Sequence, residues 1–187
     1  YDTCENIITR YYAGGKGEYD ALLLHTINIL GIEPPFNSEE FTKRKEETLV
    51  EELYRATLAH YTQKNKSLTA QTFPLFKDLF TYQKENIENV VIPISDGHKQ
   101  MNVITPLKMT FETHGKELLI NIEKFSTLAF IDNAWKEHLR DMDDLKQSVQ
   151  NAVYEQKDPL LIYKMEAFGL FKNFITNLNE ETSQFLL

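Results

Sequence analysis

Apolar residues recur every three or four positions over residues 125–178, the spacing that places side chains on one side of an α-helix. We therefore predict two amphipathic helices in this stretch, each with an apolar stripe that faces the other helix. The first stripe comprises Leu128, Ile131, Trp135, Leu139, Met142, Leu145, Val149 and Val153. The second comprises Leu161, Met165, Phe168, Phe171, Ile175 and Leu178. On the polar face of the first helix, Asp132–Lys136 and Arg140–Asp144 have the i,i+4 spacing of ion pairs.

The boundary between the two helices is marked by Asp158 and Pro159. An aspartate can accept hydrogen bonds from the free amides of a helix start, and proline is favoured at the first helical position. Residues 154–157 then form a short connection, so we predict an αα-hairpin with Tyr154 at or beside its tip. Arms of about 25 residues would be roughly 35 Å long.

Four sequence blocks in this stretch resemble SecA, the motor ATPase of bacterial preprotein export, in the region called the two-helix finger. They read WKEHL at 135–139, MDDL at 142–145, YEQKDP at 154–159 and YKMEAF at 163–168. The resemblance implies a non-catalytic part of SecA divided into the end of a scaffold helix (1–11), a helical wing region (12–124) and the finger (125–187). It also implies that the structural residues of the finger are Trp135, His138, Leu139, Met142, Asp158 and Pro159.

By the same resemblance, the finger tip contacts the translocating polypeptide and the channel through Tyr154, Val153, Gln156 and Lys157. The whole protein would be a cytoplasmic ATPase, peripheral on the bacterial inner membrane, that drives unfolded preproteins through the SecYEG channel and can form a homodimer. ATP and magnesium would bind only in motor domains absent from this sequence, and we expect no cofactor here. Without the resemblance, the residues favour Tyr154 as a loop aromatic that folds back on Val153 or Leu160. The family's basic residue and glycine before the tip tyrosine are replaced here by Ala152 and Val153.

The rest of the chain is predicted to be mainly helical, giving an elongated helical bundle. We expect helices over residues 1–12, 18–30, 38–66, 70–88 and 106–124, the last continuing into the finger. Gly14 and Gly15 are expected to close the first helix, and Gly31 the second, whose apolar face would contain Leu22, Leu23, Ile27 and Leu30. Asn37 and Glu40 have the spacing of a capping box, and Pro74 predicts a kink or a restart.

One segment has a different period. Residues 90–105 are rich in β-branched residues on both sides of Asp96–Gly97, a dipeptide that favours a two-residue type I′ turn. We predict a small β-hairpin in which Pro93 lies on an outward edge, because proline cannot donate to the ladder. The generic helical wing of the family does not lead us to expect this hairpin, which we interpret as an insertion.

The amino-acid composition argues against one class of binding partner. The formal charge of −8 and the pI of about 5.2 argue against nucleic acid, which is bound through clustered Lys and Arg. The sequence contains no signal-peptide pattern and no apolar run near the roughly 20 residues that span a bilayer. It starts and stops within helical patterns, so we expect a fragment. The single cysteine, Cys4, excludes an internal disulfide.

Catalytic and metal-binding patterns are weak. GGKGE at 14–18 lacks the rest of a phosphate-binding loop, and the five histidines include no close metal pair. Asp141, Asp143 and Asp144 spread around their helix as a solvated face. Trp135 is expected to pack the finger against a neighbouring helix. The alternative to a SecA fragment is a stand-alone helical module for protein–protein interaction.

Overall fold

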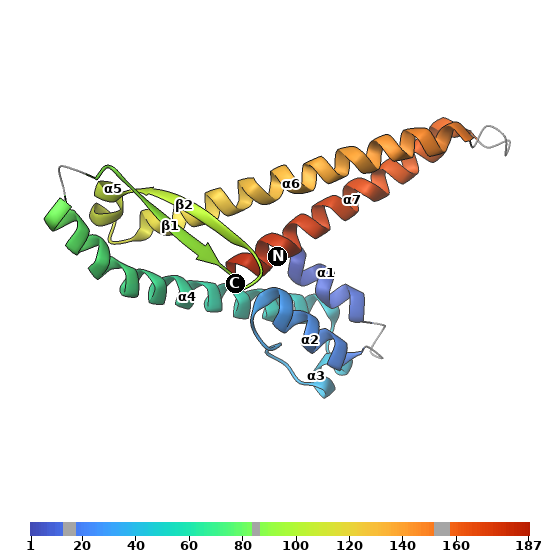
Figure 1. The fold of residues 1–187 in the computed structure, drawn as a ribbon. Helices are drawn as coiled ribbons and strands as arrows, with labels where there is room; N and C mark the ends of the chain where they lie inside the picture. The colour runs from blue at the N-terminus through green and yellow to red at the C-terminus, as the bar shows by residue number, and fades with distance from the viewer. Residues whose placement is uncertain (13–17, 84–86, 152–157) are drawn as a thin grey trace.

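The computed structural model describes residues 1–12, 18–83, 87–151 and 158–187. Its helices are α1 (Asp2–Tyr11), α2 (Tyr19–Leu30), α3 (Ser38–Lys43), α4 (Glu46–Gln83), α5 (Leu107–Glu112), α6 (Lys116–Asn151) and α7 (Pro159–Leu186), and its strands are β1 (Asn89–Ser95) and β2 (Gln100–Pro106). Figure 1 shows α6 and α7 as a long antiparallel pair that projects from a base where the other elements meet. The predicted mainly α fold, with a long αα-hairpin and one small β-hairpin, is confirmed.

The larger apolar core lies between α1, α2, α3 and the first part of α4. Its buried members are Cys4, Ile7, Ile8, Leu22, Ile29, Leu30, Phe36, Phe41, Leu49, Val50 and Leu53. Burial of each large side chain contributes about 1.5–3 kcal/mol. The predicted apolar face of α2 is partly wrong, because Ile27 is exposed and Thr26 is buried in its place.

The two ends of the described chain meet at this base (Figure 1). Arg10 of α1 forms an ion pair of 3.0 Å with Glu180 of α7. At the start of α1, Thr3 Oγ1 lies 3.4 Å from Ser183 Oγ. Helix α7 is therefore held against the first helix of the chain as well as against α6.

Several helix ends follow the predicted local chemistry. Gly31 closes α2 in the left-handed conformation with φ +66°, as predicted. The capping box of Asn37 and Glu40 is present, but it begins the short helix α3 and not the long helix. Arg44 is extended there, with φ −90° and ψ 160°, and its guanidinium pairs with both Glu40 and Glu52 across the break. The glycines expected to close the first helix lie outside the described residues.

Helix α4 runs from Glu46 to Gln83, so the restart that was one of the two predictions for Pro74 does not occur. Pro74 lies on an exposed side of the helix, and so does Ala70, whose carbonyl loses its usual amide partner. Water can hydrate that exposed carbonyl, which lowers the free-energy cost of the lost hydrogen bond. The packing of α4 along its length then outweighs the remaining cost.

The β-hairpin pairs β1 and β2 antiparallel, with Asn89 opposite Pro106 and Ser95 opposite Gln100. The strands are joined by residues 96–99, and Gly97 has φ +93° while Asp96 does not have a positive φ. The predicted type I′ turn over Asp96–Gly97, which requires two positive φ values, is therefore wrong. The side chain of Asp96 instead accepts hydrogen bonds from the amides of His98 and Lys99, at 2.8 and 2.6 Å.

The predicted helix over 106–124 is interrupted. Residues 113–115 separate α5 from α6, with φ +53° at His114 and +86° at Gly115. Thr113 Oγ1 accepts a hydrogen bond of 3.0 Å from the amide of Glu117 and so satisfies the start of α6. From Lys116 onward the helix continues into the first arm of the αα-hairpin, as predicted.

Candidate functional site

The candidate site is the pair of helices α6 and α7, which we call the finger. Asp158 and Pro159 begin its second arm in the predicted way. Asp158 Oδ1 accepts hydrogen bonds from the amides of Leu160 and Leu161, at 2.9 and 3.4 Å, and Pro159 is the first helical residue. This cap fixes where α7 begins and therefore where the connection between the arms ends.

The predicted tip residues Val153, Tyr154, Gln156 and Lys157 lie outside the described residues. Their contact with a polypeptide or a channel stays a prediction. Of the other predicted finger residues, Trp135, His138, Leu139 and Met142 all lie on α6, within two turns of one another.

An aromatic cluster in the middle of the finger joins its two arms. His138 is 7% exposed, and its ring lies 5.1 Å from Phe174 and 5.8 Å from Phe171 of α7. Trp135 meets Phe174 edge-on at 5.7 Å. Such aromatic pairs each contribute about 0.5–1.5 kcal/mol beyond the area that they bury. The cluster therefore holds the arms in a defined pairing, although Trp135 remains 45% exposed.

The prediction that the two apolar stripes face each other is wrong in part. The buried face of α6 contains Phe130, His138, Leu145 and Val149, of which only the last two belong to the predicted stripe. The stripe residues Leu128, Ile131, Leu139, Leu161, Met165, Phe168, Phe171 and Ile175 are exposed, as is Trp135. One neighbouring helix covers only a narrow strip of a helix surface, so a broad stripe leaves an apolar face open.

The β-hairpin is attached to the base of the finger at its turn. Lys99 forms an ion pair with Glu181 of α7 and lies 4.8 Å above the ring of Phe130 of α6. Phe130 in turn meets Phe185 edge-on at 5.3 Å. Lys99 is therefore the point at which the hairpin contacts both arms at once.

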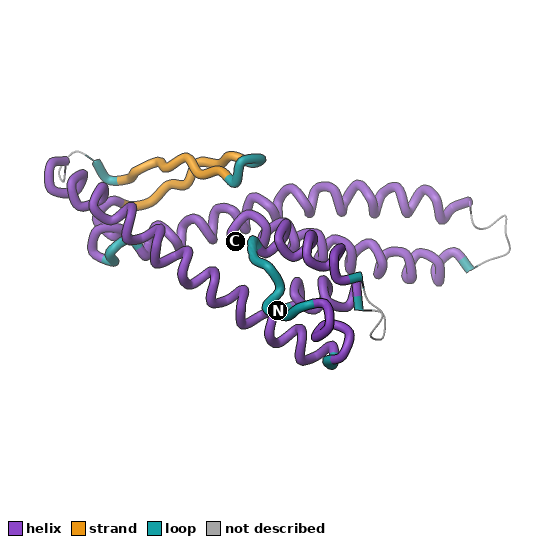
Figure 2. Tube along the Cα trace, turned by 90° about the horizontal axis from the view of Figure 1, so that it is seen from below, coloured by secondary structure: helices purple, strands orange, loops and turns teal. Residues whose placement is uncertain are grey.

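Further along, the inner side of β2 packs on α6. Val103 and Thr105 are fully buried, and Asn121 Nδ2 donates a hydrogen bond of 3.2 Å to Thr105 Oγ1. Together with the contact at the turn, this packing fixes the whole length of the hairpin along the base of the finger (Figure 2).

A cavity of about 270 Å³ lies between α4, β1, α6 and the end of α7. At its wall the hydroxyl of Tyr61 donates to the carboxylate of Glu123, and burial with this carboxylate raises the pKa of Tyr61 to about 12. Lys64 donates to the carbonyls of Leu186 and Leu187, at 3.1 and 2.8 Å. Burial lowers the pKa of Lys64. These bonds satisfy carbonyls at the end of α7.

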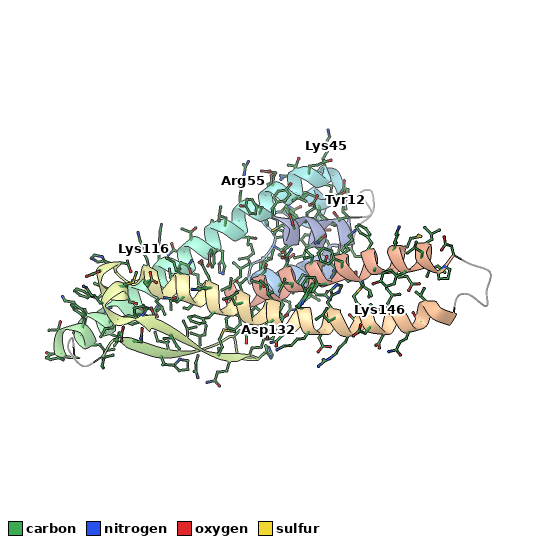
Figure 3. All side chains as sticks on the ribbon, turned by 90° about the horizontal axis from the view of Figure 1, so that it is seen from above. Tyr12, Lys45, Arg55, Lys116, Asp132 and Lys146 are labelled. Atoms are coloured by element: carbon green, nitrogen blue, oxygen red, sulfur yellow. The ribbon has the colours of Figure 1, made fainter. Side chains whose placement is uncertain are left out.

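Charged residues along the outer side of α6 form local pairs (Figure 3). The predicted pair Asp132–Lys136 is present at 2.6 Å. Arg140 pairs with Glu137 and not with Asp144, so the second predicted pair is wrong. Asp143 pairs with Lys146 at 2.9 Å. Within the described part of the chain, no three His, Cys, Asp or Glu side chains are placed to hold a metal ion.

A helix that crosses a bilayer needs about 20 mostly apolar residues. Over residues 1–12, 18–83, 87–151 and 158–187, no helix is both long and apolar enough to cross a bilayer.

Comparison with known proteins relates the whole chain to one protein family. The family model for the SecA Wing and Scaffold domain matches residues 2–187. The chain is 46% identical over 186 residues to the protein translocase subunit SecA of Cytophaga hutchinsonii and 42% identical over 186 residues to that of Flavobacterium psychrophilum. It is 40% identical over 176 residues to that of Phocaeicola vulgatus. These alignments cover 100%, 100% and 94% of this chain, but only 16% of each relative's length.

Proposed function

Because this chain belongs to the SecA wing and scaffold family, we propose that it serves as a non-catalytic lever of a SecA protein translocase, with the finger contacting polypeptide and channel. The observation that carries this proposal is the projecting pair α6 and α7 in a chain that matches the family from residue 2 to residue 187. The matched relatives bear the name protein translocase subunit SecA.

The contacts inside and below the finger support a lever. The aromatic cluster around His138 ties the two arms together at mid-length. Lys99 and the pair of Phe130 and Phe185 tie the arms to the hairpin at the base. Arg10 ties α7 to α1. A displacement of the base is therefore transmitted along the finger without a change in how its arms pair.

The tip is proposed to act on extended polypeptide through Tyr154, flanked by Val153, Gln156 and Lys157. A tyrosine ring offers apolar area and one hydroxyl, which suits transient contact with chains of unrelated sequence. The proposed partners are unfolded preproteins, the SecYEG channel and the rest of the SecA chain, with a SecA homodimer as a further association. The proposed location is cytoplasmic, peripheral on the bacterial inner membrane.

Nucleotide chemistry is proposed to lie outside this chain. The sequence has no complete phosphate-binding loop, so ATP and magnesium would bind in motor domains of the full-length protein. We expect residues 1–187 alone to show no magnesium-dependent ATP turnover. A measured turnover would overturn this part of the proposal.

The decisive experiment is site-specific crosslinking in a reconstituted translocation reaction. A photoreactive amino acid replaces Tyr154 in one full-length variant and Lys172, an exposed residue of the finger's shaft, in a matched control. We expect crosslinks from position 154 to a stalled preprotein or to the channel, and fewer from position 172. An active protein that gives no crosslink from position 154 would contradict a role for the tip.

A further inference from the structure

The hydrogen-bond pattern of the β-hairpin shows which backbone groups of β1 point away from β2. The amide of Asp96 donates to the carbonyl of Lys99 at 3.3 Å, and the amide of Leu107 donates to the carbonyl of Glu88 at 2.9 Å. In an antiparallel pair, residues that bond across the ladder alternate with residues that do not. In the observed register, the groups facing outward are therefore those of Asn89, Val91, Pro93 and Ser95.

This outer edge of β1 has no partner strand among the described residues, where the sheet consists of β1 and β2 alone. β2 is the strand that packs along α6, and Asn89, Val91, Pro93 and Ser95 are all exposed. Three amides and four carbonyls are thus open to an added strand, because proline lacks the amide.

The composition of β1 leaves this edge only weakly protected. Proteins usually guard an exposed edge with charged side chains, proline or a bulge. β1 reads NVVIPIS, with no charged residue and Pro93 as its one guard. On the outward face, Val91 and its cross-strand partner Ile104 are both exposed, adding apolar surface beside the open backbone groups.

The cavity described above lies at the end of this edge. Its lining includes Ile94 and Ser95 of β1 and apolar side chains of α4, α6 and α7, beside polar side chains of α4 and the carboxylate of Glu123. At about 270 Å³ it is smaller than most sites for drug-sized ligands. It can receive an apolar side chain of a strand that runs beside Ser95.

We propose that β1 binds an extended segment of unfolded client polypeptide as a third strand, with a client side chain entering this cavity. The inference rests on the proposed function and names a recognition mode for its substrate. Main-chain pairing supplies affinity without requiring a common sequence, which suits clients of unrelated sequence. A second copy of β1 fits less well, because each copy would bring its own proline and remove a donor from the shared ladder.

Hydrogen exchange on the full-length protein, resolved to single amides, tests this inference. The probe is an uncharged ten-residue peptide of alternating Val and Thr with blocked ends. We expect the peptide to protect the amides of Asn89, Val91 and Ser95 from exchange. Amides of the inner ladder, such as those of Ile92 and Val103, should remain as protected as before.

Two variants make the test specific to the backbone. Val91→Pro removes an outward donor and should weaken peptide binding about two- to tenfold. Val91→Thr keeps the donor and the branched side chain and should bind as the parent does. Protection of Ile92 and Val103 in both variants checks that the hairpin is intact.

The outcomes separate the inference from the proposed function. If the protein translocates preproteins but the peptide leaves the outer amides unprotected, strand addition is wrong and the proposed function stands. If the outer amides are protected before peptide is added, another segment or a second copy covers the edge and the inference is also wrong. Failure of both translocation and protection contradicts both proposals.

Discussion

At the scale of single residues, Gly31 shows how one backbone angle fixes the end of a helix. Its φ is +66°, and a Cβ there would lie 3.3 Å from the carbonyl oxygen of Leu187. We expect Gly31→Ala to destabilise the chain by about 1–2 kcal/mol, because an L-residue pays that cost in the left-handed region. Urea unfolding measures the difference.

Gly169 provides the matched control for this substitution. It lies inside α7, and a Cβ there would meet no atom within 4 Å. Gly169→Ala should therefore stabilise the chain by about 0.5–1 kcal/mol. Equal effects of the two substitutions would show that the conformation at Gly31 is not the determining factor.

His25 of α2 contacts two side chains of α1 and gives a prediction for pH. Tyr11 lies 3.1 Å from His25 Nδ1, and Arg10 lies 3.4 Å from the same ring. Burial, and secondarily the Arg10 charge, lower the pKa of His25 below its ordinary value of 6.5. Below about pH 6.5 the unfolded chain therefore binds a proton that the folded chain resists, so stability should fall as the pH drops through this value.

The measurement is the free energy of unfolding between pH 7.5 and pH 5 for the parent and for His25→Gln. The variant should lose less stability over this interval, because it lacks the proton uptake of His25 in the unfolded state. Parallel curves for the two proteins would refute the assignment.

Residue-scale features were predictable where the cause lies within a few positions. The capping box of Asn37 and Glu40 and the cap at Asp158 depend only on neighbours in sequence, and the structure contains both. The exchange of Ile27 for Thr26 on the buried side of α2 was not predictable. This exchange depends on where α1 and α7 pack against α2, and the sequence of α2 alone does not contain that information.

At the scale of elements, periodicity identified the finger helices but not which side they bury. Both arms carry apolar residues over more of their surface than one partner helix covers. Helix α6 therefore buries Phe130 and His138, which lie outside the predicted stripe, against α7. The uninterrupted α4 has a similar cause, because packing along the helix overrides a single proline. Tertiary contacts decided both outcomes.

The division into scaffold, wing and finger domains stays a prediction.

The start of α7 gives an element-scale prediction. Asp158→Ala removes the acceptor for the amides of Leu160 and Leu161 and should cost about 1 kcal/mol. Hydrogen exchange should accelerate at these two amides while the aromatic cluster farther along α7 keeps its protection. Asp158→Ser retains a cap acceptor and should exchange like the parent. Equal exchange in the alanine and serine variants would show that the cap does not hold this end.

At the scale of the whole molecule, the open apolar face of the finger predicts association of the isolated chain. Phe168 is 71% exposed and lies among other exposed apolar residues of α7. Residues 1–187 should therefore show a sedimentation coefficient that rises with concentration. Phe168→Glu should reduce this rise, whereas Leu75→Glu, at an exposed position on α4, should not. Equal behaviour of the two variants would place the contact elsewhere.

The meeting of the first and last helices sets an order for synthesis on the ribosome. Arg10 and its partner Glu180 are 170 positions apart, so α1 waits on the order of ten seconds or longer for α7 to be made. Until α7 is made, α6 has no second arm, and the base lacks the side chains that α7 contributes. We expect α1 to resist protease in ribosome-bound chains only after α7 has left the exit tunnel. Protection of α1 in shorter nascent chains would mean that the N-terminal helices fold on their own, and that the finger is added to a finished base.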